Sequence, residues 1–178
     1  MSVIFDVGHY SFPRDPGTVN PDFGITENEW CTAFTKVCQL FALSKRLYEC
    51  RIIKRESTIL ELSTRINQLN PKLVVSFHLN GFKDPYVGGT ETLYYRTSTN
   101  GQYAAEVFQR RIVRALQLRD RGIKPSVLPQ LWMVNAPIVI LEPFFLTSSV
   151  DLNRAHNKFQ ALTEAVVYGA EEVLKGLN

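Results

Sequence analysis

The chain has 178 residues, 20 basic and 17 acidic side chains and a formal net charge of +3. This length predicts a single domain over residues 1–178. Apolar residues make up 45% of the chain and charged residues 21%, which excludes a disordered or low-complexity protein. The most apolar stretch, residues 136–146, is interrupted by Glu142 and Pro143, so no integral membrane segment is expected.

In chain order, the patterns predict a strand at 3–5, a helix at 27–47, a strand at 51–53, a helix at 58–69, strands at 73–77 and 90–95, a helix at 102–118, a strand at 138–141 and a helix at 151–174. Three of the strands are nearly continuous apolar runs, which indicates burial on both faces. The run at 90–95 alternates and lies nearer an edge. The alternation of strands and helices predicts an α/β fold, with a mostly parallel central sheet flanked by helices on both faces.

The first ten residues and the cysteines give two further expectations. The first ten residues, MSVIFDVGHY, have no basic region and reach an acid at Asp6, so they predict a strand and not a signal peptide. Cys31, Cys38 and Cys50 are an odd number without framework spacing, which indicates buried thiols in a reducing compartment.

Polar side chains follow three of the predicted strands. His9 comes shortly after the first strand, His78 directly after the strand at 73–77, and Glu142 directly after the strand at 138–141. Ligands of open α/β sheets bind outside the carboxyl ends of the strands, so these side chains are expected at one edge. His156, in the last helix, is expected to lie elsewhere.

Glu27 opens the first long helix and can face His9. Two imidazoles and a carboxylate are a typical zinc set, with one position left for water. Glu142 is a fourth polar group at this rim, either as a ligand or as a general base. Each residue alone has a plainer explanation: a rim hydrogen bond for the histidines, a first-turn acid for Glu27 and an Arg-paired acid for Glu142.

Seven segments, in order, resemble the zinc-dependent N-acetylmuramoyl-L-alanine amidases of the autolysin and endolysin type. The matching segments are D-V-G-H at 6–9 with D-P-G at 15–17, G-I-T-E at 24–27, the helix at 62–70 with Arg65, S-F-H-L-N at 76–80, G-G-T-E-T-L-Y-Y at 88–95, R-G-I-K at 121–124 and P-I-V-I-L-E at 137–142. The resemblance spans nearly the whole chain.

The resemblance implies one zinc ion per chain, bound by His9, Glu27 and His78, with Glu142 as the catalytic acid and base. Glu29 is the alternative ligand on the first helix, and Glu27 is preferred because it belongs to the G-x-x-E match. Asn80 and Tyr94 are candidate substrate-binding residues; a flat ring can stack on a sugar, and core packing is the alternative for Tyr94.

The implied function is hydrolysis of the amide between N-acetylmuramic acid and the L-alanine of the peptidoglycan stem peptide. Two alternatives stay open: a zinc carboxypeptidase, for which Arg14 is the candidate carboxylate clamp, and a non-catalytic cell-wall-binding module. Some members of the family carry a blocking helical insertion where this chain has only residues 96–101. We therefore expect an open site and no obligatory protein activator.

Partners and location follow as expectations. Basic residues between Arg110 and Lys124 indicate either a solvated helix face or attraction to an anionic envelope, and no motif indicates nucleic acid. Without a signal peptide or a separate wall-binding domain, the chain is expected to be made in the cytoplasm. It would act on the cell wall after release, through a phage pore or on lysis.

Overall fold

A twisted sheet runs through the centre of the structure, a computed structural model that describes residues 2–9 and 15–177. The described residues form six strands in the spatial order β2-β1-β3-β6-β4-β5. In chain order the elements are β1 (Ser2–Val7), α1 (Glu27–Ser44), β2 (Glu49–Lys54), α2 (Ile59–Gln68), β3 (Leu73–Phe77), β4 (Thr90–Tyr95), α3 (Thr99–Leu116), β5 (Asp120–Ser126), α4 (Pro129–Met133), β6 (Ile138–Glu142), α5 (Ser149–Asn157) and α6 (Phe159–Gly176).

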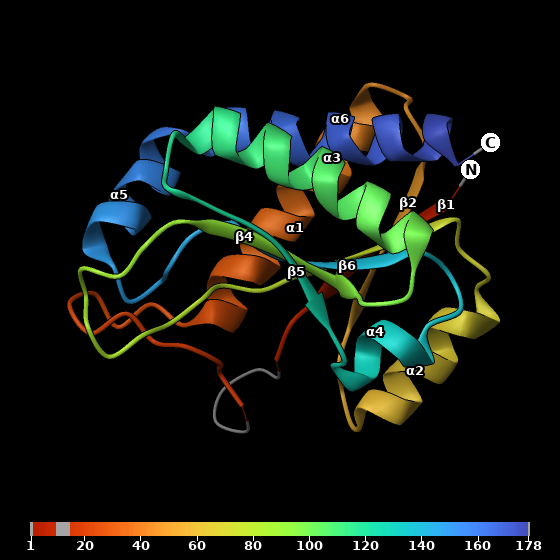
Figure 1. Ribbon diagram of the computed structural model, residues 1–178, viewed down its shortest axis with the longest axis horizontal. Coiled ribbons are helices and arrows are strands. Elements are labelled where there is room, and N and C mark those ends of the chain that lie inside the picture. Colours follow the sequence, from red (N-terminus) through yellow and green to blue (C-terminus); the bar gives the residue numbers. More distant parts are fainter. Residues whose placement is uncertain (1, 10–14, 178) are drawn as a thin grey trace.

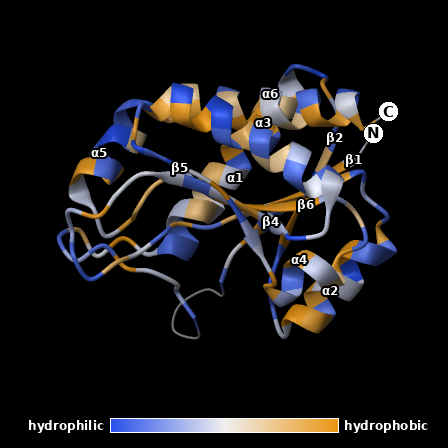
Figure 2. Cartoon of the chain, in the orientation of Figure 1, coloured by the Kyte–Doolittle hydropathy of each residue, from blue (hydrophilic) through white to orange (hydrophobic). Residues whose placement is uncertain are grey.

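Helices cover both faces of the sheet, as the continuous apolar strands predict (Figure 1). Alternate residues of β1 face opposite sides, so Phe5 belongs to the core under α1, α3 and α6, whereas Ile4 belongs to the core under α2 and α4. Strands β1 and β6 are hydrophobic along most of their length (Figure 2). The predicted α/β fold with helices on both faces is therefore confirmed.

The sheet is parallel except at one junction. β1 pairs in parallel with β2 and β3, and β3 pairs in parallel with β6. β4 is antiparallel to β6 and parallel to β5. The carboxyl ends of β1, β3 and β6 therefore lie at the same edge of the sheet as the amino ends of β4 and β5.

Two parts of the fold differ from the sequence prediction. β5 was not expected because Gly122 and Pro125 interrupt its pattern, and Pro is tolerated there because β5 is an edge strand. The predicted helix at 151–174 is two helices, because Lys158 leaves helical geometry at φ −109° and ψ 21°. Apolar spacing continues across this break, so the pattern does not reveal it.

The three cysteines are buried and free, as predicted. Within the described residues, no helix is long and apolar enough to cross a membrane.

Candidate metal centre

The strand order reverses between β1 and β3, and the candidate site lies at the carboxyl ends of these two strands. The next strand in the chain, β2, pairs with one side of β1, and the strand after it, β3, pairs with the other side of β1. Gly8 N donates to Phe77 O at 3.0 Å, and His78 N donates to Leu141 O at 3.0 Å. These backbone bonds extend the sheet by one residue and bring the segments after β1, β3 and β6 together.

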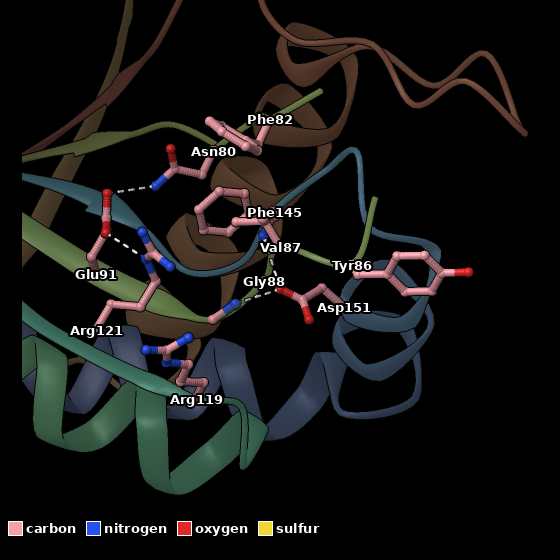
Figure 3. Close-up of a pocket in the computed structure, with 12 residues that line it drawn as sticks. Asn80, Phe82, Tyr86, Val87, Gly88, Glu91, Arg119, Arg121, Phe145 and Asp151 are labelled. Carbon is pink, nitrogen blue, oxygen red and sulfur yellow. Dashed lines mark hydrogen bonds and ion pairs between the residues drawn. The ribbon is translucent and has the colours of Figure 1, made fainter. Parts of the chain in front are cut away.

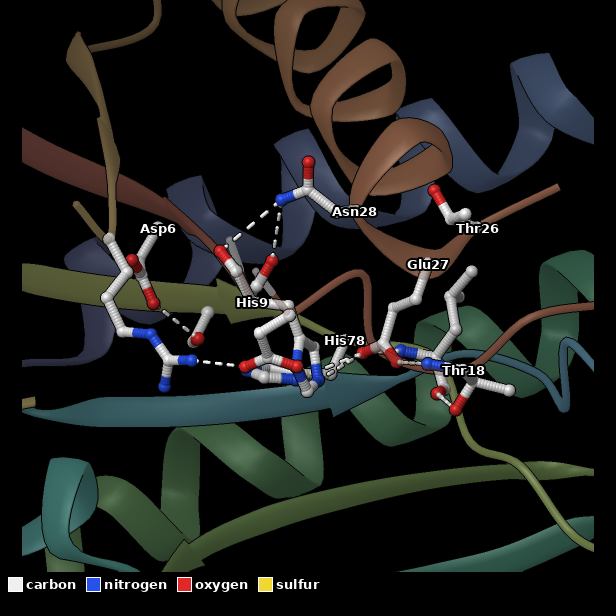
Figure 4. Close-up of polar contacts among 12 residues, drawn as sticks. Asp6, His9, Thr18, Thr26, Glu27, Asn28 and His78 are labelled. Atoms are coloured by element: carbon white, nitrogen blue, oxygen red, sulfur yellow. Dashed lines mark hydrogen bonds and ion pairs between the residues drawn. The ribbon is translucent and has the colours of Figure 1, made fainter. Parts of the chain in front are cut away.

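Three side chains converge at this edge, as the sequence predicts (Figure 4). Glu27 Oε1 lies 3.2 Å from His9 Nε2 and 3.1 Å from His78 Nδ1. One ligand atom from each residue lies within 4.8 Å of the other two. The two rings meet edge to face, with centroids 5.0 Å apart.

Glu27 is the acid of the cluster, and Glu29 is not. Glu27 is 2% exposed and also accepts hydrogen bonds from the backbone N–H groups of Thr18 and Leu79, both at 2.9 Å. Burial alone would raise the pKa of Glu27, but its hydrogen bonds with both histidines outweigh burial and hold that pKa well below its usual range. The site therefore keeps a buried negative charge.

Glu29 instead caps the helix to which both acids belong. Its carboxylate accepts from Thr26 N at 3.0 Å, while Glu29 N donates to Thr26 Oγ1 at 3.2 Å. This reciprocal pair is a capping box, which satisfies two backbone donors at the start of α1.

His9 is oriented by a chain of charged partners that the sequence analysis did not identify. Its Nδ1 lies 2.9 Å from Asp15 Oδ1, and Asp15 Oδ2 accepts from Arg55. Because the Asp15 carboxylate only accepts, it holds a proton on Nδ1, which leaves Nε2, the nitrogen toward Glu27, to bind a metal when the imidazole is neutral. Arg55 directly follows β2, so the strand-end reasoning that located His78 would also have found it.

The backbone at His9 is held in an uncommon conformation. Its φ is +64°, in the left-handed region that non-glycine residues seldom adopt. The Asn28 side-chain amide donates to Gly8 O at 3.1 Å and to His9 O at 3.3 Å. α1 therefore supplies both an acid of the cluster and the amide that fixes the neighbouring loop.

Two glycines make room for the cluster. A Cβ at Gly8 would lie 2.6 Å from both ring nitrogens of His78. A Cβ at Gly17, where φ is +72°, would lie 2.5 Å from Glu27 Oε2 and 2.8 Å from His9 Cδ2. No side chain fits at either position without displacing the donor atoms.

Glu142 lies beside the cluster at the end of β6. Its Oε2 is shielded from solvent and has no hydrogen-bond partner among the described residues. Burial raises the pKa of Glu142 well above its usual range, and the neighbouring charges of Glu27 and Glu91 raise it further. A carboxyl group beside a potential metal site can take up and release a proton during a reaction.

The other residues that the sequence singles out have different outcomes. Asn80 lies at the same edge and donates to Glu91 Oε1 at 2.8 Å. Tyr94 is 8% exposed and belongs to the hydrophobic core, so the expected substrate contact is corrected to core packing. His156 is exposed on α5 and does not belong to the cluster, as expected. Arg14 lies outside the described residues.

The shortness of the segment at 96–101 does not bear on the site in the way that the sequence suggests. It follows β4, whose carboxyl end is at the opposite edge of the sheet because β4 is antiparallel to β6. The Gly101 position faces Ile138 O, at the start of β6. The shortness of this segment therefore does not determine how open the cluster is.

The residues fit a bound metal ion. Two imidazole nitrogens and one carboxylate oxygen are a donor set of catalytic zinc sites, which leave one position open. A buried carboxylate that contacts two histidines also has a charge that a cation would balance. The structure thus brings together a set of side chains that can hold a divalent metal.

Comparison with known proteins identifies the family. The model of the N-acetylmuramoyl-L-alanine amidase family (Amidase_3) matches residues 3–172 of the chain. The chain belongs to this family. All six predicted site residues fall within the matched range.

Individual relatives agree with this assignment. An uncharacterized cell wall amidase of Bacillus anthracis is 37% identical over 87 residues, which are 44% of this chain and 16% of the relative. The N-acetylmuramoyl-L-alanine amidase LytC of Bacillus subtilis is 27% identical over 106 residues, which are 57% of this chain and 21% of that protein. The chain thus matches only a small part of these longer relatives.

The fold is also that of a solved amidase. An N-acetylmuramoyl-L-alanine amidase from Clostridium difficile 630 superposes with a TM-score of 0.87 and 24% identity, over 98% of this chain and 96% of the other. At this identity the similarity establishes the fold. The chemistry has to be argued from this chain's own residues.

Proposed function

We propose that this chain hydrolyses the amide bond between N-acetylmuramic acid and the L-alanine of the peptidoglycan stem peptide, with one zinc ion held by His9, Glu27 and His78. The family and the donor set both support this proposal. The observation that carries it is the adjacency of that donor set to Glu142, a carboxyl group with an unpartnered, solvent-shielded oxygen.

Adjacency follows from the pairing of the strands. Phe77 and Leu141 are partners on β3 and β6, so His78 and Glu142 are the next residues on neighbouring strands. Neighbouring strands lie about 4.8 Å apart. An amide and a water molecule between these two side chains would contact both the donor set and the proton-transferring group.

Zinc bound there would supply a Lewis acid that polarises the amide carbonyl and makes water more acidic. Glu142 takes the proton of the attacking water as hydroxide adds to the carbonyl carbon. It then delivers that proton to the nitrogen as the C–N bond breaks, so the products are a lactyl carboxylate and a free alanine amine. Asp15 and Arg55 hold the proton of the neutral His9 imidazole on Nδ1, so that Nε2 is the nitrogen available to the metal.

Hydrolysis of purified peptidoglycan tests the proposal, with products read by mass spectrometry. We expect stem peptides with a free N-terminal alanine and intact glycan strands, and we expect a chelator to abolish their release. Glu142→Gln removes the proton-transferring group, and Glu29→Gln on α1 is the matched control that leaves the cluster alone. Release from Glu142→Gln at the wild-type rate would refute the assigned role.

The same experiment separates the alternatives. A carboxypeptidase would shorten stem peptides from their C-terminus and leave the muramic acid linkage intact. A wall-binding module would sediment with peptidoglycan and release nothing. Comparison of the rate with and without added host proteins tests the expectation that no activator is needed. We also expect the protein to reach the cell wall by lysis or through a pore.

A further inference from the structure

A cavity of about 610 Å³ opens at the amino ends of β4 and β5 (Figure 3). Glu91 on its wall is the antiparallel partner of Glu142. The cavity is therefore one strand spacing, about 4.8 Å, from the proposed proton-transferring group. Its side-chain lining comes mainly from Asn80, Phe82, Glu91, Arg119, Arg121 and Phe145.

The acidic groups of this cavity already have partners. Glu91 accepts from Asn80 Nδ2 and from Arg121 Nε, both at 2.8 Å. Asp151 Oδ2 accepts from the backbone N–H groups of Gly89 at 2.8 Å and Phe145 at 3.1 Å. These carboxylates are structural, because each ties two segments of the wall together.

The two arginines of this cavity, in contrast, have N–H donors that make no hydrogen bond to the described residues. Arg121 uses only Nε to bind Glu91, and no hydrogen bond to a described residue uses its terminal nitrogens. Its guanidinium carbon lies 4.9 Å from the centroid of the Phe145 ring, which fixes its plane over the cavity wall. The guanidinium of Arg119 makes no hydrogen bond or ion pair within residues 2–9 and 15–177, although its backbone carbonyl accepts from Thr90.

A glycine allows these two arginines to approach the wall. Gly89 has a φ of +121°, and a Cβ there would lie 2.6 Å from Arg119 O and 2.9 Å from Arg121 Cγ. A side chain at position 89 would therefore displace the start of β5. The cavity thus combines two guanidinium groups, with unused donors, and apolar walls.

We propose that this cavity binds a carboxylate of the stem peptide, with Arg119 and Arg121 as its donors. The inference rests on the proposed function, because it places the peptide beside Glu142. Arginine donors pair well with planar carboxylates, and the Phe82 and Phe145 rings suit the aliphatic parts of a peptide. An extended peptide spans about 3.3–3.6 Å per residue, so the bound carboxylate lies one to three residues beyond the cleaved amide.

Synthetic N-acetylmuramoyl tripeptides test this inference. Three substrates have an acidic second residue and differ only in two carboxylates, that of the second residue and that of the C-terminus. In the first substrate both are free, in the second the carboxylate of the second residue is a primary amide, and in the third the C-terminal carboxylate is a primary amide. We expect one of the two amides to lower kcat/KM about tenfold or more, because a charge-assisted hydrogen bond is lost. The affected substrate identifies which carboxylate is bound.

The Arg119→Gln variant links that preference to the cavity. It should reduce the ratio of acid to amide kcat/KM toward one, with the loss falling mainly on the acid substrate. Arg121→Gln should do the same but also frees Glu91, so its zinc content and unfolding temperature are measured alongside. Arg114→Gln, an exposed arginine on α3 outside this cavity, is the matched control and should keep the wild-type ratio.

Two results overturn the inference: equal kcat/KM for all three substrates, or an Arg119→Gln variant that loses activity equally on all of them. Calorimetric binding of the free tripeptides gives a second readout that needs no hydrolysis. If no substrate is cleaved but the acid still binds more tightly than the amide, the proposed function fails and the carboxylate site stands. If substrates are cleaved without preference and no peptide binds, the carboxylate site fails alone.

Discussion

Substitution of Gly8 by alanine should weaken zinc binding and leave the stability of the metal-free fold nearly unchanged. The backbone at Gly8 is held on both sides: its N–H donates to Phe77 O at 3.0 Å, and its carbonyl accepts from Asn28 Nδ2 at 3.1 Å. An added Cβ would lie 2.6 Å from both ring nitrogens of His78. Since the backbone is fixed, the imidazole has to move.

The size of that movement sets the expected loss. Ordinary contact with a Cβ begins near 3.4 Å, and the nearest ring atom, Cε1, would lie 2.4 Å away, so the ring retreats by about 1.0 Å. Binding sites tolerate errors of about 0.5 Å in their donor atoms. We therefore expect zinc affinity to fall about 10- to 100-fold, or roughly 1.4–2.8 kcal/mol. His78 is only half-buried, so its ring can shift toward solvent and the metal-free protein should unfold near the wild-type temperature.

Zinc affinity is measured by competition with a chromogenic chelator, and stability by thermal unfolding of the metal-free protein. Gly24→Ala is the matched control, because Gly24 has a φ of +66° but no atom within 4 Å of an added Cβ. It should cost about 1–2 kcal/mol of stability and leave zinc affinity unchanged. A Gly8→Ala variant that binds zinc within twofold of wild type would refute the placement of His78 among the ligands.

Four further outcomes follow from the contacts of the site. Glu142→Gln should keep zinc, by elemental analysis, and lose at least about 100-fold in kcat/KM on peptidoglycan fragments; equal turnover would exclude proton transfer by this group. Arg55→Gln should weaken zinc binding about tenfold in the chelator competition, because Asp15 loses its cation, and an unchanged affinity would show that this ion pair does not act through the metal. Glu29→Ala should lower the unfolding temperature slightly, because the capping box is lost, without changing zinc affinity, and weaker zinc binding would return it to the ligand set. The hydrogen bond to Glu27 raises the pKa of His9 in the metal-free protein, so this stabilisation is complete below about pH 6.5 and is lost as the pH rises through the higher native pKa. The unfolding temperature of chelator-treated protein should fall as the pH rises above about 6.5, with a smaller slope in His9→Asn, and equal slopes would contradict this linkage.

The buried strands were predictable because burial on both faces leaves little choice of residue. β1, β3 and β6 are apolar at most positions and buried along nearly all of their length. β5 was not predictable from such a pattern, since an edge strand can hold Gly122 and Pro125 and remain mostly exposed. The break at Lys158 was hidden because both helices bury their apolar residues against the same core.

The ligand set was predictable for a topological reason. Parallel strands end at the same edge, so a histidine after β1 and another after β3 had to be neighbours once those strands paired. Glu27 could be distinguished from Glu29 by the sequence motif alone, but its physical reason is the N-terminus of α1, where position N1 faces the sheet edge and position N3 folds back on the cap.

The carboxylate-binding cavity follows from the single antiparallel junction of the sheet. β4 reverses direction beside β6, so the amino ends of β4 and β5 join the carboxyl ends of the parallel strands at one edge. Arg119 and Arg121 therefore reach the neighbourhood of Glu142, although a sequence reading that misses β5 assigns them to a solvated basic face. Removal of the charge at Arg119 should change substrate preference, whereas removal of the charge at Arg114 should not, because only the first residue lies at that edge.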